Sequence, residues 1–451
     1  MYRQQQWVEL LSSRRILIAG YGREGRSTHA AIGQLAPSAE VIVAMNDAEA
    51  AALMDEARAK GMPYDIVVKS PGIPTMKLEG HCDRETITSQ TDLFLQIYGD
   101  QTIAVTGTKG KSTTTKLIAH VLEHTLSPAK QTLLAGNIGI PLFDILPQVD
   151  SQSIIVAELS CHQLENIHRG PRTGVLLNLF PEHLDHYRDY RDYQMAKMQM
   201  VLHQTEADDC IINTDSDDLL ALTRQLADRI PSTIHFYSHL EADQLFGTLP
   251  LPLAGSHNRA NIYAAWQAAH LQGVTFGQFT DTLTSFQPLP HRLEKVGTYR
   301  GITFYNDSIS TIPQATIAAV ETLERVDTLI VGGMDRGIDY STLVQYLAHP
   351  TQAGSQIRNV AFVGQAGRRI HHDLSLLPGS PLDRMNALLL NDDYENIVTW
   401  CFEHTKAGKI CLLSPAAASY DSFKNFEERG NTYKNLIRTL GESLMEANCE
   451  K

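Results

Sequence analysis

Short runs of apolar residues, each ending in glycine or a polar turn, recur along the whole chain and predict the buried strands of an α/β fold. The run at 102–107 is followed by a helical stripe in which Leu117, Ile118, Val121 and Leu122 share one face. Because such sheets bind ligands at the carboxyl ends of their strands, we expect binding residues in the turns that follow these runs. The predicted strands occupy 15–20, 40–44, 65–70, 102–107, 153–160, 174–178, 327–333, 359–364 and 409–414.

The length of the chain sets the expected number of domains. At 451 residues it should form about three, each with a core of its own. We predict a Rossmann-like N-terminal domain over 1–98 and a central α/β domain of the phosphate-loop ATPase type over 99–287. A Rossmann-like α/β domain is predicted over 288–451, with the hinge before it at Gln287 and Pro288.

Composition and charge narrow the class of protein. Charged residues at 20% and hydrophobic residues at 43% are ordinary for a soluble globular protein. The net charge of −13 argues against a nucleic-acid partner, because binding a phosphate backbone needs clustered Lys and Arg. The six cysteines are scattered without a C-x-x-C pair, which predicts reduced thiols. No apolar run approaches the roughly 20 residues that span a bilayer, and the N-terminus lacks a signal peptide's apolar core, so we expect a cytoplasmic protein without membrane contact.

The segment 102–115 combines a strand, a glycine turn and a helix start, which is the geometry that holds a polyphosphate. Glycines let backbone N–H groups approach the anion, and the free amides and dipole of the first helical turn favour negative charge. Lys111 is expected to reach the β/γ-phosphates and Ser112 to ligate Mg²⁺. Val105 stands where the common phosphate-loop pattern has its first glycine, so a glycine-rich turn with a solvated lysine is the alternative.

A second glycine turn, Gly20-Tyr-Gly22-Arg-Glu-Gly25, follows the first predicted strand and matches G-x-G-x-x-G. The next strand leads to Asn46 and Asp47, an acid roughly 20 residues further on, as in the first half of a dinucleotide-binding unit. The turn Ser70-Pro71-Gly72 ends another strand and supplies a second loop at the same edge. Three interpretations are open: an NAD or FAD site, a site for another nucleotide, and tight strand–helix packing without a ligand.

Several residues suited to metal chemistry follow the central strands. Glu158 ends an apolar strand, where phosphate-loop enzymes usually hold Mg²⁺, although a lone glutamate there is more often solvated. The cluster Glu182-His-Leu-Asp-His186 suggests a metal or reaction centre. A zinc hydrolase could use its histidines and aspartate, but the sequence supplies no supporting helix motif for one. Lys197 lies among methionines on a predicted helix and, taken alone, is a solvated lysine.

Polar residues also gather in later segments. Asn258 and Asn261 are one turn apart on a predicted helix face, which suits an adenine or phosphate contact and equally a helix N-cap. The polar segments 304–313 and 414–431 follow strands of the third domain. Because two such loops would share one edge of the sheet, they favour a substrate site there over plain surface.

The order of these motifs resembles that of the Mur ligases over nearly the whole chain. Similarity is greatest to members that add D-glutamate to UDP-N-acetylmuramoyl-L-alanine in cytoplasmic peptidoglycan precursor synthesis. The resemblance implies three domains, of which the first binds the UDP part of the substrate, the second ATP, and the third the amino acid. It is carried by G-T-K-G-K-S, E-L-S, E-H-L-D-H-Y, Lys197, S-H-N-R-A-N, L-P-H-R, N-D-S and the run L-S-P-A-A-A-S-Y-D-S-F-K-N-F-E-E-R-G.

The resemblance also implies a role for individual residues. Those expected to contact the UDP substrate are Gly22, Arg23, Glu24, Asn46, Asp47, Ser70, Pro71, Gly72, Asn137, Ser160, Gln163 and His183. Those expected to contact ATP are Gly107, Thr108, Lys109, Gly110, Lys111, Ser112, Thr113, Asn261, Arg292 and Asp307. The amino acid is expected at Thr311, Arg336, Ser419, Tyr420 and Phe426. Mg²⁺ is expected at Ser112, Glu158, His183 and a carbamylated Lys197, and the catalytic residues are expected to be Lys111, Glu158, His183 and Lys197.

The implied reaction joins a carboxylate to an amine at the expense of ATP. The alanyl carboxylate attacks the γ-phosphate to give an acyl phosphate, which the amine of glutamate then attacks. His183 and Asp185 are placed to orient substrate or relay a proton. Carbamylation of Lys197 requires a neutral amine, so its pKa is expected below the ~10.4 of a free lysine. The enzyme is expected to act as a monomer.

Two positions depart from the family's pattern. Ile309 and Arg336 stand where the D-glutamate-adding members commonly carry lysines. Because Arg can clamp a carboxylate in bidentate fashion, an acidic amino acid is still expected, but L-glutamate or a relative is an alternative to D-glutamate.

Different classes of protein also stay open at this point. A nucleotide-dependent dehydrogenase would use the Gly20 turn but not the phosphate loop, and a non-catalytic nucleotide-binding protein would keep the phosphate loop without the chemistry. A folate or cyanophycin ligase would share the ATP core, but the separate Gly20 turn counts against it.

Overall fold

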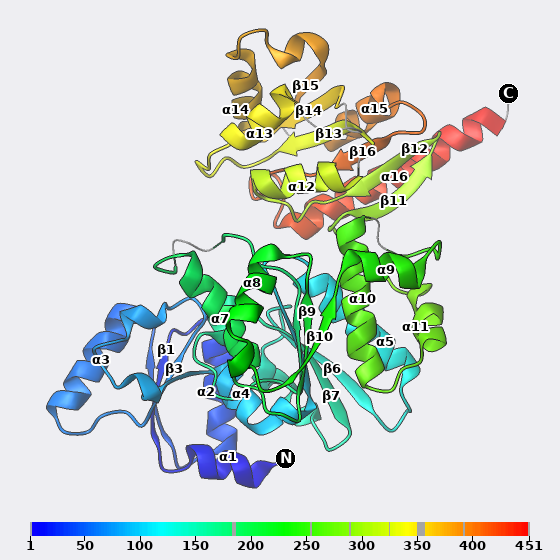
Figure 1. Ribbon diagram of the computed structural model, residues 1–451. Coiled ribbons are helices and arrows are strands. Elements are labelled where there is room, and N and C mark those ends of the chain that lie inside the picture. Colours follow the sequence, from blue (N-terminus) through cyan, green and yellow to red (C-terminus); the bar gives the residue numbers. More distant parts are fainter. Residues whose placement is uncertain are drawn as a thin grey trace. The chain divides into compact units, whose positions relative to one another are not determined.

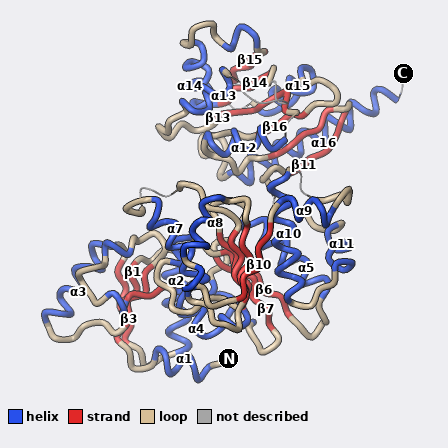
Figure 2. The backbone as a smooth tube through the Cα atoms, in the orientation of Figure 1, coloured by secondary structure: helices blue, strands red, loops and turns tan. Residues whose placement is uncertain are grey.

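The structure is a computed structural model with three β-sheets (Figures 1 and 2). It describes residues 2–182, 186–252, 255–287, 290–323, 325–349, 357–390 and 393–449. The chain divides into two compact units, Met1–Phe286 and Gln287–Lys451, and each is described by itself. The first unit contains two of the sheets and the second unit contains the third.

The N-terminal sheet has the strand order β2-β1-β3-β4 and is parallel throughout. Its strands are β1 (Arg15–Ala19), β2 (Glu40–Ala44), β3 (Ile66–Lys69) and β4 (Ile87–Ser89). Its helices are α1 (Gln4–Leu11), α2 (Arg23–Leu35), α3 (Asp47–Ala59) and α4 (Gln90–Tyr98). Because Ala19 pairs with both Ala44 and Lys69, β1, β2 and β3 end at the same level, and the loops after them share one edge.

The central sheet is also parallel, with the order β10-β9-β8-β5-β7-β6. Its strands are β5 (Thr102–Thr106), β6 (Gln131–Gly136), β7 (Ser153–Glu158), β8 (Thr173–Leu176), β9 (Asp209–Asn213) and β10 (Thr233–Tyr237). Its helices are α5 (Lys111–Thr125), α6 (Cys161–Leu164), α7 (Tyr190–Leu202), α8 (Asp217–Gln225), α9 (His239–Phe246), α10 (Ser256–Leu271) and α11 (Phe276–Leu283).

Alternate residues of β5 face two different cores, because successive side chains of a strand point to opposite faces. Ile103 and Val105 pack with α5, α10 and α11, which Figure 1 shows gathered at one side of the sheet. Ala104 packs on the other face, in a core that also contains residues of α1, α4 and α7. The predicted apolar stripe of α5, from Leu117 to Leu122, is buried.

One apolar core spans the N-terminal and central sheets and explains why they form a single compact unit. Trp7 of α1 is fully buried, its indole N–H donates to the Tyr98 hydroxyl at 3.2 Å, and its ring meets Phe143 edge-on with centroids 5.3 Å apart. Aromatic side chains of this size bury enough apolar surface to dominate such a contact. The positions of the two sheets are therefore linked through α1 and α4.

The third sheet has the order β11-β12-β16-β13-β14-β15, with an antiparallel pair β11–β12 at one edge and parallel pairing elsewhere. Its strands are β11 (Glu294–Tyr299), β12 (Ile302–Asn306), β13 (Val326–Gly332), β14 (Asn359–Val363), β15 (Asn386–Leu390) and β16 (Ile410–Leu413). Its helices are α12 (Pro313–Leu323), α13 (Ser341–Ala348), α14 (Gly364–Ser375), α15 (Tyr394–His404) and α16 (Phe426–Cys449).

The predicted fold class is confirmed: the chain is α/β with a three-domain architecture, and each predicted strand corresponds to a strand of the structure. The boundaries predicted at 98/99 and 287/288 stay predictions. Within the described residues, no helix combines the length and apolarity that a membrane crossing requires.

The two glycines of α2 provide a matched test of the close packing at the first glycine turn. A Cβ on Gly25 would lie 2.1 Å from the Gly20 carbonyl oxygen, whereas a Cβ on Gly33 would meet nothing within 4 Å. Gly25→Ala should therefore lower the free energy of unfolding by about 1–3 kcal/mol or more, because backbone must move. Gly33→Ala should raise it by up to about 1 kcal/mol through helix propensity. Equal effects of the two substitutions in urea denaturation would show that α2 does not approach β1 this closely.

Candidate active site

The predicted phosphate loop lies between β5 and α5 in the first unit. Gly110, the residue before α5, has a φ of 86°, which glycine adopts without strain. The N–H groups of the first turn of α5, which contains Ser112 and Thr113, have no carbonyl one turn earlier in the helix to bond, so they are suited to an anion. A Cβ on Gly110 would lie 2.8 Å from the Asn261 side-chain amide of α10. The structure thus brings Asn261, a predicted ATP contact, to the phosphate loop.

Two lysines converge on one carbonyl oxygen of this loop. Lys111 donates from Nζ to the Gly107 oxygen at 3.0 Å and to the Thr108 oxygen at 2.9 Å. Lys197, from α7, donates to the same Gly107 oxygen at 2.9 Å and is only 2% exposed. Taken alone, the sequence predicts a solvated side chain for Lys197, and that prediction is wrong. The ammonium group is buried and lies 4.9 Å from the centre of the Tyr193 ring.

Burial changes the proton affinity of both lysines. Desolvation, together with the neighbouring positive charge of Lys111, lowers the pKa of Lys197 to about 7, while Cys161, Glu182 and Glu158 oppose the shift. Desolvation also lowers the pKa of Lys111, against the attraction of Glu158 and Glu182. The depressed pKa that carbamylation of Lys197 requires is thus present.

Glu158 ends β7 and is 2% exposed. Its Oε1 accepts a hydrogen bond from the Asn137 side-chain amide at 2.8 Å, while its buried Oε2 has no hydrogen-bond partner among the described residues. A buried carboxylate oxygen without a partner is costly, so a cation would satisfy it. Oxygen donors of this kind suit Mg²⁺, so Glu158 fits the role of one ligand of the predicted metal.

Two polar contacts fix the remainder of the phosphate loop. The hydroxyls of Thr108 and Tyr193 share a hydrogen bond of 2.7 Å, and the Lys109 backbone N–H donates to the Asn178 side-chain oxygen at 2.8 Å. The Lys109 ammonium group forms an exposed ion pair with Glu182 at 2.6 Å. Lys109 therefore pairs with a carboxylate, and the Gly107 carbonyl accepts hydrogen bonds from Lys111 and Lys197 instead.

The loops predicted to bind the UDP substrate meet at the edge of the N-terminal sheet. The Ser70 hydroxyl donates to the Gly20 carbonyl at 2.7 Å, which joins the first glycine turn to the Ser70-Pro71-Gly72 turn. Arg23 donates to the Gly139 carbonyl at 2.9 Å and so reaches the loop that holds Asn137. Asn46 caps α3 by accepting from the Glu49 N–H at 2.9 Å, and Asp47 is the first residue of that helix.

Glu24 and Gln163 connect the glycine turn to the segment after β7. The Gln163 side-chain amide donates to Glu24 Oε1 at 2.6 Å, and its oxygen accepts from the Ser160 N–H at 2.9 Å. Desolvation raises the pKa of Glu24, with the Gln163 hydrogen bond and the Lys69 charge opposing. Glu24, Ser160 and Gln163, predicted separately, thus form one hydrogen-bonded chain.

His183 and Asp185 lie outside the described residues, so the structure does not place them. Among the residues that it does describe, no group of three or more His, Cys, Asp or Glu side chains is arranged to hold a metal. His186 instead bonds through Nε2 to Glu165 Oε1 at 2.7 Å.

In the second unit, the predicted ATP residue Asp307 follows β12 and is 3% exposed. Burial raises its pKa to about 6, although Ser310, Ser414 and the Leu293 N–H donate hydrogen bonds to it. The Ser414 hydroxyl, at the end of β16, donates to Asp307 Oδ2 at 2.7 Å. The neighbouring Arg292 has a buried Nε for which the described part of the chain offers no hydrogen-bond partner.

The residues predicted to bind the amino acid surround the ends of β12, β13 and β16. Ser419 is buried and Tyr420 exposed, and the Met334 N–H donates to the Ala418 carbonyl at 2.9 Å, which brings the exposed Arg336 segment beside them. Phe426 begins α16, and its carbonyl accepts from the Ser308 hydroxyl at 2.8 Å. Thr311 and Ile309 are half-buried in the segment after β12.

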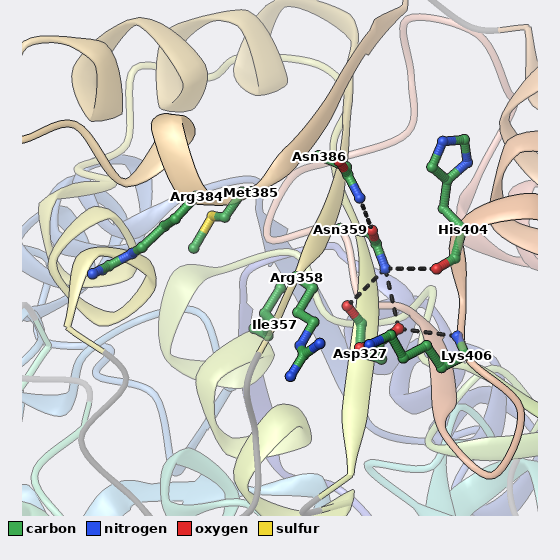
Figure 3. A pocket seen from close by; sticks show the side chains of 9 residues that line it. All are labelled: Asp327, Ile357, Arg358, Asn359, Arg384, Met385, Asn386, His404 and Lys406. Atoms are coloured by element: carbon green, nitrogen blue, oxygen red, sulfur yellow. Dashed lines mark hydrogen bonds between the residues drawn. The ribbon is translucent and has the colours of Figure 1, made fainter.

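A cavity of about 550 Å³ lies at the opposite end of the strands of this sheet, away from these residues (Figure 3). It is lined by residues at the amino ends of β13, β14 and β15, among them Asp327, Asn359 and Asn386. The Asn359 amide donates to Asp327 Oδ2 at 3.1 Å and to the His404 carbonyl at 3.1 Å, as Figure 3 shows. None of the predicted site residues lines this cavity, and ligands of such sheets bind at the carboxyl ends of strands.

Sequence reasoning missed several residues that organise these loops. Arg429 is 1% exposed and donates to the Ser308 carbonyl at 2.8 Å and to the Ala417 carbonyl at 3.1 Å. Its place in the K-N-F-E-E-R-G run was a usable signal. Lys69 and Glu165 form a buried ion pair at 3.0 Å, for which the sequence offers no local signal.

Comparison with known proteins gives consistent results. The model of the Mur ligase middle domain matches residues 105–269. The UDP-N-acetylmuramoyl-L-alanine--L-glutamate ligase of a Micromonospora species is 34% identical, over 95% of this chain and 97% of the relative. The UDP-N-acetylmuramoylalanine--D-glutamate ligase of Salinibacter ruber is 30% identical, over 94% and 98%.

Among solved structures, the MurF ligase of Thermotoga maritima in complex with ADP matches with a TM-score of 0.53 at 15% identity and covers 97% of both chains. At that identity the likeness shows the fold alone. The identity and coverage of the sequence relatives go further, and on that ground the chain belongs to the Mur ligase family.

Proposed function

We propose that this chain is an ATP-dependent ligase that adds glutamate to UDP-N-acetylmuramoyl-L-alanine, with release of ADP and phosphate. The observation that carries the proposal is the convergence of Lys111 and Lys197 on the Gly107 carbonyl of the phosphate loop. The partnerless oxygen of Glu158 supports it. Two lysines and a carboxylate that can bind a metal, all at a phosphate loop, are suited to phosphoryl transfer. Hydride transfer by a Rossmann-type dehydrogenase does not require these groups.

In the first step, the alanyl carboxylate attacks the γ-phosphorus of ATP, and the bond to the β-phosphate oxygen breaks. Two anions meet, so the step requires positive charge in a site from which water is excluded. Lys111 is placed to supply it, and Gly107, Thr108, Lys109, Gly110, Ser112, Thr113 and Asn261 are proposed to hold the triphosphate and the nucleoside.

Mg²⁺ would supply further charge, and Ser112, Glu158, His183 and a carbamylated Lys197 are proposed to hold it. Asn137 supports this assignment, because its hydrogen bond to Glu158 Oε1 leaves Oε2 for the cation. Carbamylation would convert the buried Lys197 cation to an anion. That change removes a charge repulsion with Lys111 and adds oxygen donors of the type Mg²⁺ prefers.

In the second step, the amine of glutamate attacks the carbon of the acyl phosphate, and phosphate leaves as the amide forms. Arg292 and Asp307 are proposed to contact ATP from the C-terminal domain. Thr311, Arg336, Ser419, Tyr420 and Phe426 are proposed to hold the amino acid. The UDP part of the substrate is proposed to bind Gly22, Arg23, Glu24, Asn46, Asp47 and the 70–72 turn, and its muramoyl side Asn137, Ser160, Gln163 and His183.

D-glutamate is the first candidate for the acceptor, because the motif order is most similar to that of the D-glutamate-adding members. L-glutamate is the second candidate. Two observations favour it. Ile309 and Arg336 replace the lysines that D-glutamate-adding members commonly carry, and a Micromonospora relative that is 34% identical is an L-glutamate ligase.

The substrate assay measures phosphate release with ATP, Mg²⁺ and UDP-N-acetylmuramoyl-L-alanine, with each glutamate enantiomer in turn. We expect D-glutamate to give at least about tenfold higher kcat/KM than L-glutamate, a difference of about 1.4 kcal/mol in transition-state binding. The reverse preference would establish the second candidate. No release with either enantiomer would refute the proposed function.

Removal of the proposed carbamate should be reversible by small anions. Lys197→Ala should lower kcat about a thousandfold or more, because a group that stabilises transition-state charge is lost. Formate or acetate should partly restore it by placing a carboxylate in the vacated space. Lys111→Ala is the matched control, since an anion cannot replace its cation. Equal rescue of both variants, or full activity of Lys197→Ala, would contradict the carbamate assignment.

The pH dependence of carbamylation follows from the pKa of Lys197. Because only the neutral amine reacts with CO₂ and the pKa is about 7, the neutral fraction rises as the proton is lost above pH 6. At fixed dissolved CO₂, the rate of carbamylation should increase about tenfold from pH 6 to pH 8. A ¹³C carbamate NMR signal with ¹³CO₂ measures it, with Lys197→Ala as the control. A pH-independent rate, or a signal that survives in the control, would count against the assignment.

A further inference from the structure

A buried triad of ionisable side chains lies between the N-terminal sheet and the central sheet. Lys69, the last residue of β3, is fully buried and lies 3.0 Å from Glu165 Oε2, just after α6. The other oxygen, Glu165 Oε1, accepts from His186 Nε2 at 2.7 Å, and the His186 side chain is 12% exposed. Glu165 therefore uses its two oxygens to hold two different segments.

Two neutral side chains, those of Thr75 and Asn166, extend the hydrogen bonding around Glu165. The Thr75 hydroxyl donates to Glu165 Oε2 at 2.7 Å and in turn accepts from the Asn166 side chain at 2.8 Å. Burial would raise the pKa of Glu165, but the Lys69 charge and these hydrogen bonds prevail and hold it below its usual value. The carboxylate is thus charged and bonded on both oxygens.

Each end of the triad adjoins a loop of the proposed active site. Lys69 directly precedes the Ser70-Pro71-Gly72 turn, which is bonded to the Gly20 turn. His186 precedes Tyr187, whose ring meets Tyr193 edge-on with centroids 5.7 Å apart. The Tyr193 hydroxyl bonds Thr108 of the phosphate loop at 2.7 Å. A continuous set of contacts joins the two loops.

Apolar packing beside the triad is incomplete. A cavity of about 250 Å³, lined among others by Thr75, Glu165, His186 and Tyr187, lies against the triad. A lysine is rarely buried completely unless it is paired, and replacing such a pair by apolar residues is often neutral or stabilising. The burial of this triad beside a cavity is therefore explained by the loop positions that it specifies, and not by a gain in stability.

Resting on the proposed function, we propose that the Lys69–Glu165–His186 triad positions the UDP-substrate loop and the phosphate loop relative to each other, with Glu165 as the central positioning residue. The triad touches neither reacting group. It sets the distance between the carboxylate that attacks and the phosphate that is attacked. Misplacement of bound reactants by about 1 Å can cost about a hundredfold in rate.

The test compares Glu165→Gln and Lys69→Met with Asp208→Asn, a control that breaks the partly buried Arg169–Asp208 ion pair (2.7 Å) of the same unit. Glu165→Gln should lower kcat about a hundredfold, while the Kd of each substrate, measured separately by calorimetry, changes less than about threefold. Asp208→Asn should lower Tm without this loss of kcat. Loss of kcat that merely tracks Tm across the three variants would overturn the proposal.

The double variant Lys69→Met/Glu165→Leu separates positioning from stability. It should recover Tm, because an apolar pair of similar volume replaces the ion pair, yet kcat should stay low, because the His186 contact is gone. Recovery of kcat together with Tm would show that the pair is only structural.

Hydrogen exchange tests the coupling without reference to catalysis. In Lys69→Met and Glu165→Gln, the amides of 186–193 should exchange about tenfold faster than in the wild type and in Asp208→Asn. Unchanged exchange in both variants would overturn the triad's role whatever the activity. Faster exchange in both variants, together with a wild-type protein that releases no phosphate, would leave the coupling standing and reject the proposed function alone.

Discussion

The Gly107 carbonyl oxygen, which accepts hydrogen bonds from both Lys111 and Lys197, is the contact on which the rest of the site depends. Two ammonium groups held this close in a buried site repel each other strongly, because the effective dielectric constant there is low. Burial lowers the pKa of both. The arrangement is stable with anions present, and a triphosphate together with carbamylation of Lys197 would offset the excess positive charge. One geometric feature would thus account for both the proposed nucleotide binding and the proposed reactivity of Lys197.

The N-terminal and central sheets form one unit, and the proposed reaction between two bound substrates needs such a fixed distance between their loops. Apolar packing around Trp7 and Tyr98 joins the two sheets, and polar contacts then join the loops themselves. Gln163 reaches Glu24, and Glu165 reaches Lys69. The segment 158–165 therefore combines a proposed metal ligand, a proposed substrate contact and a proposed positioning residue along one short stretch of chain.

Local patterns predicted much of this structure. Strands and the α5 stripe followed from hydrophobic periodicity, and the phosphate loop from glycine spacing next to a strand and a helix, since these are short-range constraints. The burial of Lys197 and of Lys69 could not be predicted from their neighbours in sequence. Their partners, Gly107 and Glu165, are 90 or more residues away. The fit of Asn261 against Gly110 is likewise a long-range contact; the helical spacing of Asn258 and Asn261 allowed either a phosphate contact or a helix N-cap, and the resemblance to a family favoured the first.

The phosphate loop and its lysines are proposed to activate a carboxylate as an acyl phosphate, and isotope transfer measures that step directly. The experiment uses UDP-N-acetylmuramoyl-L-alanine labelled with ¹⁸O in both oxygens of its alanyl carboxylate, followed by mass spectrometry of the phosphate released with ATP and glutamate. We expect one ¹⁸O atom in each phosphate, with the other retained in the new amide. Amide product accompanied by unlabelled phosphate would contradict an acyl phosphate.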